Sequence, residues 1–274
     1  MEHVFILDVS PDMDEDRVWR EKIHPILPQI KEDILDICQY GFTEMLNNVI
    51  DHSQSKYVEI TVEYNSLKIV FYIIDNGIGI FNKIQKDFNL ESPKHAILEL
   101  AKGKLTSDPT RHTGEGIFFT SRIFDIFFIQ SESLSFLGHN NSDFIFENLQ
   151  EKTEKGTGVY MQINLNSSLN IKDVFDEYTA DKNDYGFSKT IVPVKLLQEG
   201  EALVSRSQAK RLIVRFEKFK KVVLDFDGVK FIGQAFADEI FRVFQNQYPN
   251  LLLVYINAND DVEKMIKHVL YKGL

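Results

Sequence analysis

A buried strand pattern that ends in an aspartate and two closely spaced glycines constrains this chain more than any other feature. Residues 71–80 read Phe-Tyr-Ile-Ile-Asp-Asn-Gly-Ile-Gly-Ile, so that Asp75 closes the strand and Gly77 and Gly79 follow. A glycine backbone has no Cβ and can approach a flat ligand closely, and a carboxylate beside it can accept the amino proton of an adenine. Tight turns after strands use the same residue types. This segment alone therefore leaves a ligand site and a simple turn as alternatives.

A long amphipathic helix is predicted upstream of this strand. Apolar residues recur near helical spacing through residues 28–53, which predicts one helix over this range. Glu44, Asn48 and His52 are spaced by four and share one polar face of it. Glu44 could orient or deprotonate a hydroxyl nucleophile, and the neutral side-chain oxygen of Asn48 suits a Mg²⁺ ion that keeps most of its water and phosphate ligands. A solvated helix face is the alternative interpretation.

Two further glycine segments follow. Gly114 and Gly116 precede apolar residues at helical spacing, so we expect them to open a helix whose N-terminal N–H groups and positive dipole favour a phosphate. Thr157 stands between Gly156 and Gly158 at the start of a strand pattern, where its hydroxyl could bond an adenine nitrogen or a neighbouring water. Ordinary turn chemistry would account for either segment taken alone.

In order and spacing, these four segments resemble the nucleotide site of the GHKL ATPases. This superfamily includes gyrase, the heat-shock-90 chaperones, the histidine kinases, the MutL mismatch-repair proteins and the anti-sigma-factor serine kinases. The resemblance covers roughly residues 1–168 and implies an N-terminal α/β sandwich of the Bergerat fold, a mixed sheet with helices on one face. It also implies ATP and Mg²⁺ as ligands. The segments that resemble the family's four boxes are residues 44–48, 75–80, 113–117 and 156–157.

The resemblance implies roles for individual residues. Asp75 would bind the adenine amino group, Asn48 would hold Mg²⁺, and Glu44 would be the catalytic carboxylate if the protein has chemistry. The other nucleotide-binding residues that it implies are His52, Gly77, Gly79, Ile80, Lys104, Thr113, Gly114, Gly116, Ile117 and Thr157. Residues 81–113 would form the ATP lid. Its basic residues could meet a phosphate or be ordinary surface charges; they are Lys94, Lys102, Lys104 and Arg111.

The composition of the chain agrees with two domains outside the membrane. Its 274 residues are enough for two cores, and no apolar run approaches the ~20 residues that span a bilayer. The N-terminus is a strand pattern without the basic start and cleavage site of a signal peptide. A single cysteine, Cys38, excludes an internal disulfide, and no Cys/His cluster suggests zinc. We therefore expect a cytoplasmic protein with no membrane partner.

The charge distribution and the alternation of strand and helix patterns both distinguish a second domain from the first. Residues 171–274 hold 16 basic and 15 acidic residues, which leaves 15 and 26 for residues 1–170. Polar residues 169–186 are predicted as a linker, and residues 187–274 alternate strand and helix, as in a small α/β domain. We expect strands at 189–196, 222–226 and 251–256, and helices at 205–217, 234–247 and 260–270.

This second domain resembles the STAS domains of anti-anti-sigma factors, and more closely a STAS-like domain often attached to such ATPases. Residues 222–240 carry the resemblance, which extends over roughly 185–274. In the anti-anti-sigma family a serine at the start of the helix is phosphorylated by the partner ATPase. Ala235 occupies the matching position, and no Ser or Thr lies in this loop. The departure argues against a phospho-switch here, and a plain strand–loop–helix crossover is the alternative.

A run of basic residues lies on and after the first helix of the second domain. Its members are Arg206, Lys210, Arg211, Arg215, Lys218, Lys220 and Lys221. We interpret the run as a solvated face. Docking onto the acidic first domain is an alternative. Nucleic-acid binding is disfavoured because the chain is acidic overall and has no helix-turn-helix pattern.

These observations predict an ATP-binding regulatory protein. The first hypothesis is an ATP- and Mg²⁺-dependent serine kinase or ATPase of the anti-sigma-factor type, acting on another regulatory protein or on its own STAS-like domain. The alternatives are a nucleotide-gated conformational switch and an interaction module with little or no turnover. A homo-oligomer is compatible with each. A sensor histidine kinase is disfavoured, because the sequence shows no sensor, membrane segment or phosphoacceptor helix pair.

Overall fold

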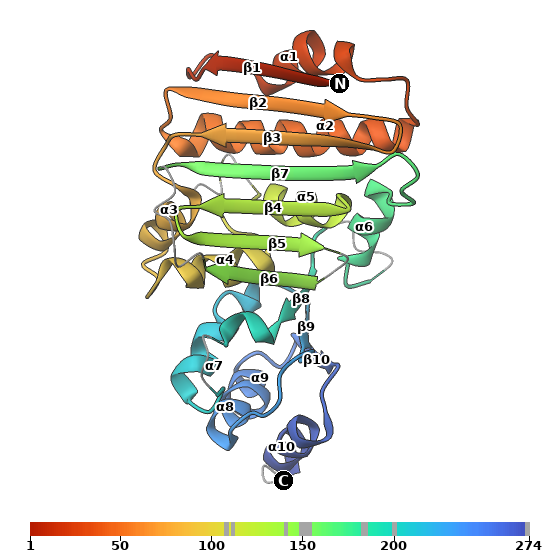
Figure 1. Cartoon of the computed structure of the whole chain (residues 1–274). Helices are drawn as coiled ribbons and strands as arrows, with labels where there is room; N and C mark the ends of the chain where they lie inside the picture. Colours follow the sequence, from red (N-terminus) through yellow and green to blue (C-terminus); the bar gives the residue numbers. More distant parts are fainter. Residues whose placement is uncertain are drawn as a thin grey trace. The chain divides into compact units, whose positions relative to one another are not determined.

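The chain forms two compact units, Met1–Val174 and Phe175–Leu274. The computed structural model describes residues 1–106, 110, 113–139, 142–147, 155–181, 186–198 and 202–271. Each unit has a sheet of its own, and the first runs from red to green in Figure 1 while most of the second is blue. No described helix is both long enough and apolar enough to cross a bilayer.

The first unit is built on a seven-stranded sheet in the order β1-β2-β3-β7-β4-β5-β6. Its strands are β1 (Glu2–Asp8), β2 (Tyr57–Tyr64), β3 (Lys68–Asp75), β4 (Ile126–Ser131), β5 (Leu134–His139), β6 (Ser142–Glu147) and β7 (Thr157–Asn164). Every neighbouring pair is antiparallel, so the prediction of a mixed sheet is wrong. The reason is that β7 inserts between β3 and β4 and runs antiparallel to both, so these two strands never pair.

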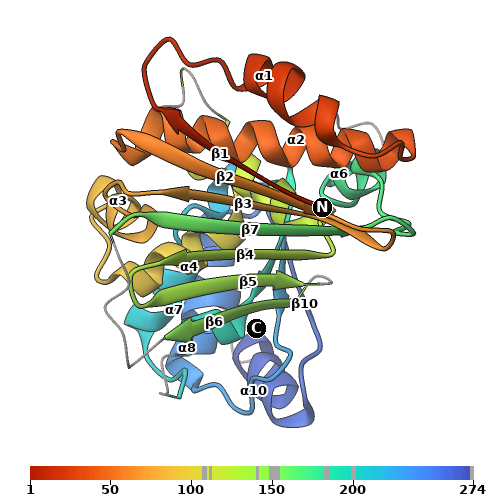
Figure 2. The ribbon, with the colours of Figure 1, turned by 45° about the horizontal axis from the view of Figure 1, so that its top comes forward.

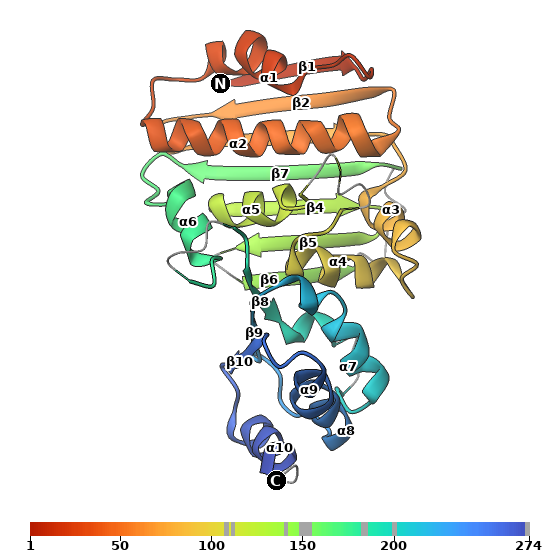
Figure 3. The same cartoon turned by 180° about the vertical axis from the view of Figure 1, so that it is seen from behind.

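Helices cover one face of this sheet. Figure 3 shows them in front of the strands, Figure 1 shows the opposite face with no helix of this unit on it, and Figure 2 tilts the same ribbon. They are α1 (Glu15–Val18), α2 (Glu32–Asn48), α3 (Ile80–Asp87), α4 (Pro93–Lys102), α5 (Gly116–Ile123) and α6 (Ile171–Glu177). Alternation along β2 turns Val58, Ile60 and Val62 into the core under the helices.

Helix α2 is shorter than the sequence predicts. It begins at Glu32 and not at residue 28, because Lys31 is still extended, with φ −63° and ψ 146°. After Asn48 it continues as a π-helical turn over Val49–Ser53, which ends at a left-handed Gln54. The predicted apolar face is confirmed, and Cys38 is a fully buried core residue on it, as expected.

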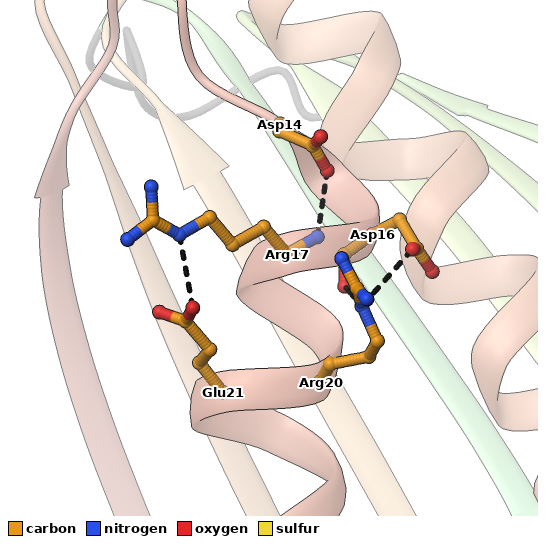
Figure 4. Close-up of polar contacts among 5 residues, drawn as sticks. All are labelled: Asp14, Asp16, Arg17, Arg20 and Glu21. Carbon is orange, nitrogen blue, oxygen red and sulfur yellow. Dashed lines mark hydrogen bonds and ion pairs between the residues drawn. The ribbon is translucent and has the colours of Figure 1, made fainter.

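Local polar contacts stabilise the first turns of helix α1 (Figure 4). Oδ1 of Asp14 accepts a hydrogen bond from the N–H of Arg17 at 2.7 Å, which caps the helix. The ion pairs of Arg17 with Glu21 and of Arg20 with Asp16 are exposed and add little. A π-helical turn, Trp19–Ile23, follows α1, and the buried Trp19 ring packs 5.6 Å from that of Phe42 on α2. This contact packs the segment after α1 against α2.

The second unit contains a three-stranded parallel sheet in the order β10-β9-β8. The strands are β8 (Lys189–Pro193), β9 (Lys221–Asp225) and β10 (Leu252–Ile256). The helices are α7 (Arg206–Ile213), α8 (Gln234–Asp238), α9 (Gln245–Gln247) and α10 (Asp260–Tyr271); a π-helical turn, Glu239–Phe244, joins α8 to α9. Parallel strands require such crossover helices, and the predicted alternation of strand and helix is confirmed.

Three details of the second unit differ from the prediction. Strand β8 ends at Pro193, before the predicted end at residue 196, and a 3₁₀ turn, Val194–Leu197, follows it. Helix α7 stops four residues early, because Val214 is extended and Arg215 is left-handed with φ 67°. Arg215 is also buried, so it does not belong to a solvated basic face. The stretch predicted as a linker, 169–186, contains α6, and its residues 182–185 lie outside the described part of the chain.

Candidate functional site

A cavity of about 320 Å³ lies in the first unit, within the size range of small-molecule sites. It collects the predicted segments from four distant parts of the sequence. Eleven of the thirteen predicted residues line it: Glu44, Asn48, His52, Asp75, Gly79, Ile80, Thr113, Gly114, Gly116, Ile117 and Thr157. Gly77 and Lys104 are not part of its lining.

Sheet register explains why Asp75 and Thr157 meet. Asp75 is the last residue of β3 and pairs with Thr157, the first residue of β7. Oδ1 of Asp75 accepts a hydrogen bond from the N–H of Gly77 at 2.7 Å, and Oγ1 of Thr157 accepts one from the N–H of Ile80 at 3.0 Å. Thr157 also donates to Asp75 through its backbone and its side chain. The carboxylate and hydroxyl therefore form one polar edge inside the cavity.

The electrostatics of Asp75 reflect competing effects. Burial raises the pKa of its carboxyl, because desolvation disfavours the ionised form, whereas the hydrogen bonds from Gly77 and Thr157 lower it. The net shift is upward. A buried carboxylate oxygen is a strong hydrogen-bond acceptor, so this carboxylate is suited to bind an N–H group of a ligand.

Apolar side chains form the walls around this edge. They are Met45, Val49, Ile78, Ile84, Phe88, Leu100, Leu105, Phe118, Ile129 and Val159. Apolar walls with one convergent polar edge are typical of a site for a flat, mostly apolar ligand such as a nucleobase.

The glycines of the first pair have different positions. Gly79 has a left-handed φ of 79° and lines the cavity, where only glycine adopts this backbone easily. Gly77 lies against the turn after α2 instead, and a Cβ there would collide with the carbonyl oxygen of Ser53. The N–H of Ile78 donates to the same oxygen at 2.9 Å. Gly77 thus allows β3 to dock on that turn and does not itself face the cavity.

The second glycine pair brings the start of α5 against Glu44. Gly114, with φ 71°, leaves no room for a Cβ next to the backbone of Leu105, whose N–H donates to the Gly114 carbonyl at 3.0 Å. Gly116 is the first residue of α5, and a Cβ on it would collide with Oε2 of Glu44. The Glu44 carboxylate therefore lies at the N-terminal turn of this helix, as the interpretation of these residues requires.

Several negative groups surround Glu44. Burial raises the pKa of its carboxyl, and the charges of Glu15 and Glu115 raise it further. The pKa of Tyr40 is raised by burial and by Glu44 and Glu115. The pKa of Glu115 is raised by burial and lowered by Lys104, which places that predicted lysine near the site although it does not line the cavity. A carboxylate with a raised pKa is a more effective general base near neutral pH.

The side-chain amide of Asn48 has an unsatisfied atom. Its Nδ2 is buried and has no hydrogen-bond partner among the described residues. Buried polar atoms without partners are rare and call for an explanation, and a ligand in the cavity would supply one. Among the described residues no group of three or more His, Cys, Asp and Glu side chains is arranged to hold a metal ion.

The basic residues of the predicted lid have separate environments. Lys94 pairs with Glu147 at 2.6 Å, and Lys102 is fully buried with its Nζ 2.6 Å from Oε1 of Glu99. Lys102 is therefore neither a surface charge nor part of the cavity lining. Arg111 lies outside the described residues. Much of residues 81–113 is helical, in α3 and α4.

The sequence interpretation missed Lys83. This residue lines the cavity from α3, and its Nζ lies 2.7 Å from Oδ2 of Asp87, which also lines it. Helical spacing was the available signal, because Ile80, Lys83, Ile84 and Asp87 follow one another at i, i+3, i+4 and i+7. Lys83 is the cation of the described part of the chain that we would add to the candidate site.

In the second unit, neighbouring residues of the chain fill the space around the loop that joins β9 to α8. Gly233, before α8, leaves no room for a Cβ because the Cα of Val204 would be 2.8 Å away. Oδ1 of Asp225 accepts hydrogen bonds from the N–H of Asp227 and from Nδ2 of Asn257, each at 2.9 Å. Ala235 is the second residue of α8 and offers no hydroxyl.

Comparison with known proteins identifies part of the second unit. Residues 208–263 match the family model of the STAS-like domain of unknown function DUF4325. This match confirms the predicted C-terminal STAS-like domain. A comparison with curated proteins found no match to this chain.

Proposed function

We propose that the first unit binds ATP and Mg²⁺ as a Bergerat-fold domain of the GHKL type. The observation that carries the proposal is the convergence of four distant segments on one cavity, with a buried carboxylate at an apolar end and a second carboxylate at a helix N-terminus. The helices on one face of the sheet also support it.

The residues present fit these ligands. Asp75 and Thr157 offer an acceptor and a hydroxyl to the amino edge of an adenine, between apolar walls. The first turn of α5 offers N–H groups to phosphates. Asn48 would hold Mg²⁺ by its Oδ1, because a metal ion binds the oxygen of an amide, and its Nδ2, which has no partner among the described residues, would donate to a ligand oxygen. Mg²⁺ often takes one protein ligand and several phosphate and water oxygens. When bound, Mg²⁺ supplies neutralisation of phosphate charge.

We further propose that the chain is a regulatory kinase or ATPase of the anti-sigma-factor type that acts on a partner protein. Glu44 would accept the proton of the attacking hydroxyl, of a serine or of water, and its raised pKa suits that task. Phosphoryl transfer demands mainly positioning and charge stabilisation, so one carboxylate at the α5 end of the cavity suffices.

A nucleotide-gated switch with little turnover is the second candidate. It is favoured by the corner before α8, where Ala235 replaces a hydroxyl acceptor. Ser188 is buried, and its Oγ accepts the N–H of Ala180 at 2.8 Å; Ser205 caps α7. These two hydroxyls are poor phosphate acceptors, whereas Ser207 on α7 is exposed. A kinase would therefore phosphorylate either Ser207 or a separate protein.

Incubation of the full chain with Mg²⁺ and γ-labelled ATP distinguishes these functions. Free phosphate and protein-bound label are followed separately, with Glu44→Ala as the variant. We expect one of the two products from the wild type and neither from Glu44→Ala, with ATP still bound by both. Binding without either product would support the switch, and no binding would contradict the proposed site.

A further inference from the structure

The first strand of the large sheet combines a free edge with exposed apolar side chains. β1 is the terminal strand of the sheet, and one face of this sheet carries no helix (Figure 1). Val4 and Ile6 lie on that face, because they pair with Thr61 and Glu59 and not with the buried residues of β2, and they are 53% and 68% exposed. Its register with β2 is unbroken from Glu2 to Asp8, without a bulge or a proline. Proteins usually protect such an edge with lysines, prolines or bulges, because its unpaired N–H and C=O groups can recruit another strand.

Carboxylates surround these apolar side chains. Glu2 and Asp8 stand at the two ends of β1 on the same face as Val4 and Ile6. On β2, Glu63 lies directly opposite Glu2, and Glu59 directly opposite Ile6. Like charges opposite one another destabilise a sheet, and none of these four carboxylates has an ion-pair partner among the described residues.

The negative field extends to the neighbouring strands. Burial raises the pKa of the Tyr72 hydroxyl on β3, and the charges of Glu63 and Glu2 raise it further. The pKa of Tyr160 on β7 is raised by burial, by Tyr72 and by Glu63. An acidic, partly aromatic surface therefore adjoins the free edge.

We infer that the β1 edge binds an extended segment of a partner protein in which Lys or Arg alternates with aliphatic residues. Such a segment would add an eighth strand, with main-chain hydrogen bonds supplying affinity and alternate side chains specificity. Its cations would lie on the face of Glu2, Asp8, Glu59 and Glu63 and would cover Val4 and Ile6 with their methylene stems. Its aliphatic residues would lie on the opposite face, beside Phe5 and Leu7. A second copy fits less well, because antiparallel pairing of two β1 strands about Phe5 places Glu2 opposite Asp8.

A labelled peptide of sequence Lys-Val-Lys-Ile-Lys-Val-Lys tests this inference on the full chain. Fluorescence anisotropy should show saturable binding that weakens with salt, and no binding of the Glu-Val-Glu-Ile-Glu-Val-Glu analogue. Hydrogen exchange should slow at residues 3–7 when the basic peptide is bound. Ile6→Lys should weaken binding roughly tenfold or more, because it places a cation opposite a cation.

Phe144→Lys is the matched control. Phe144 is 40% exposed on β6, the opposite edge strand, and its substitution should leave the affinity unchanged within about twofold. Thermal unfolding checks that both variants are folded. Equal affinity in wild type and Ile6→Lys, or slowed exchange elsewhere than in β1, would overturn the inference. So would a peptide that does not bind while Ile6→Lys changes the oligomeric state, because a second copy would then occupy the edge.

Discussion

Two corners of this protein start from the same local chemistry and reach different results. At the end of β3, Asp75 accepts the N–H of Gly77, and Gly79 follows with φ 79°. At the end of β9, Asp225 accepts the N–H of Asp227, and Gly228 follows with φ 78°. Both are aspartate turns that end a strand and lead towards a helix.

The surroundings decide what each corner can do. Asp75 is 5% exposed, faces a cavity and shares its polar edge with Thr157 of the neighbouring strand. Asp225 is partly exposed, is engaged by Asn257, and does not line that cavity. An aspartate–glycine turn therefore indicates a ligand site only where the neighbouring strand and helices leave a cavity beside the aspartate, as they do at Asp75.

The largest expected effect separates the two aspartates. Asp75→Asn should weaken ATP binding about 100-fold, because the amide replaces an acceptor with a donor towards the adenine amino group and loses a charged hydrogen bond. Asp225→Asn changes the matching turn and should leave the affinity unchanged within about twofold. Isothermal titration calorimetry measures both. Equal losses in the two variants would remove the distinction between the corners.

Gly233→Ala should act on the second unit alone. A Cβ there meets the main chain of Val204, which cannot rotate away, so we expect a loss of ~1–3 kcal/mol in the free energy of unfolding of that unit. Urea unfolding by circular dichroism reports both units, whereas the fluorescence of Trp19, the one tryptophan of the chain, reports the first. A shift of the Trp19 transition would contradict this expectation.

Gly116→Ala should lower turnover roughly tenfold with little loss of stability. The added methyl displaces the flexible Glu44 carboxylate from the start of α5, so the catalytic geometry suffers more than the packing. Gly186→Ala is the control, because a Cβ there meets nothing within 4 Å. Phosphate release and thermal unfolding are compared in the three proteins. A large loss of stability with normal turnover would place Glu44 outside the chemistry.

The smallest expected effect is a dependence of ATP affinity on pH. Burial raises the folded-state pKa of Asp75 above its ordinary value, so its ionised, accepting form is lost at a higher pH than for an exposed aspartate. Affinity should therefore decline in mild acid, by less than ~tenfold per pH unit, whereas the same protonation relieves the cost of a buried charge and favours the folded state. The ATP affinity of Asp75→Asn, measured by calorimetry at several pH values, should lack the part of the decline that comes from protonation of Asp75. An identical decline in that variant would assign it to another group.

The sequence predicted the structure best where a short local pattern was enough to locate the end of a strand or the start of a helix. The end of β3 at Asp75, the start of α5 at Gly116 and the start of β7 at Thr157 were predicted from the residues themselves, and the structure brings all three segments to one cavity. The elements of the second unit were also predicted, within a few residues at their ends.

Long-range pairing accounts for what the sequence could not show. The insertion of β7 between β3 and β4, which makes the sheet antiparallel, depends on strands far apart in the chain. The burial of Lys102 with Glu99 and the contact of Gly77 with Ser53 depend on which helix packs where. A single charged or glycine residue carries no signal for these contacts, because the same residue type serves a surface, a turn or a site.

Hydrogen exchange of the full chain with and without Mg²⁺ and ATP tests the central claim most directly. The account predicts slower exchange at residues 75–80, 114–117 and 157–159, which meet at the cavity, and no change at residues 225–235 in the matching corner of the second unit. Unchanged exchange at all of these cavity segments under saturating nucleotide, or protection confined to residues 225–235, would contradict it.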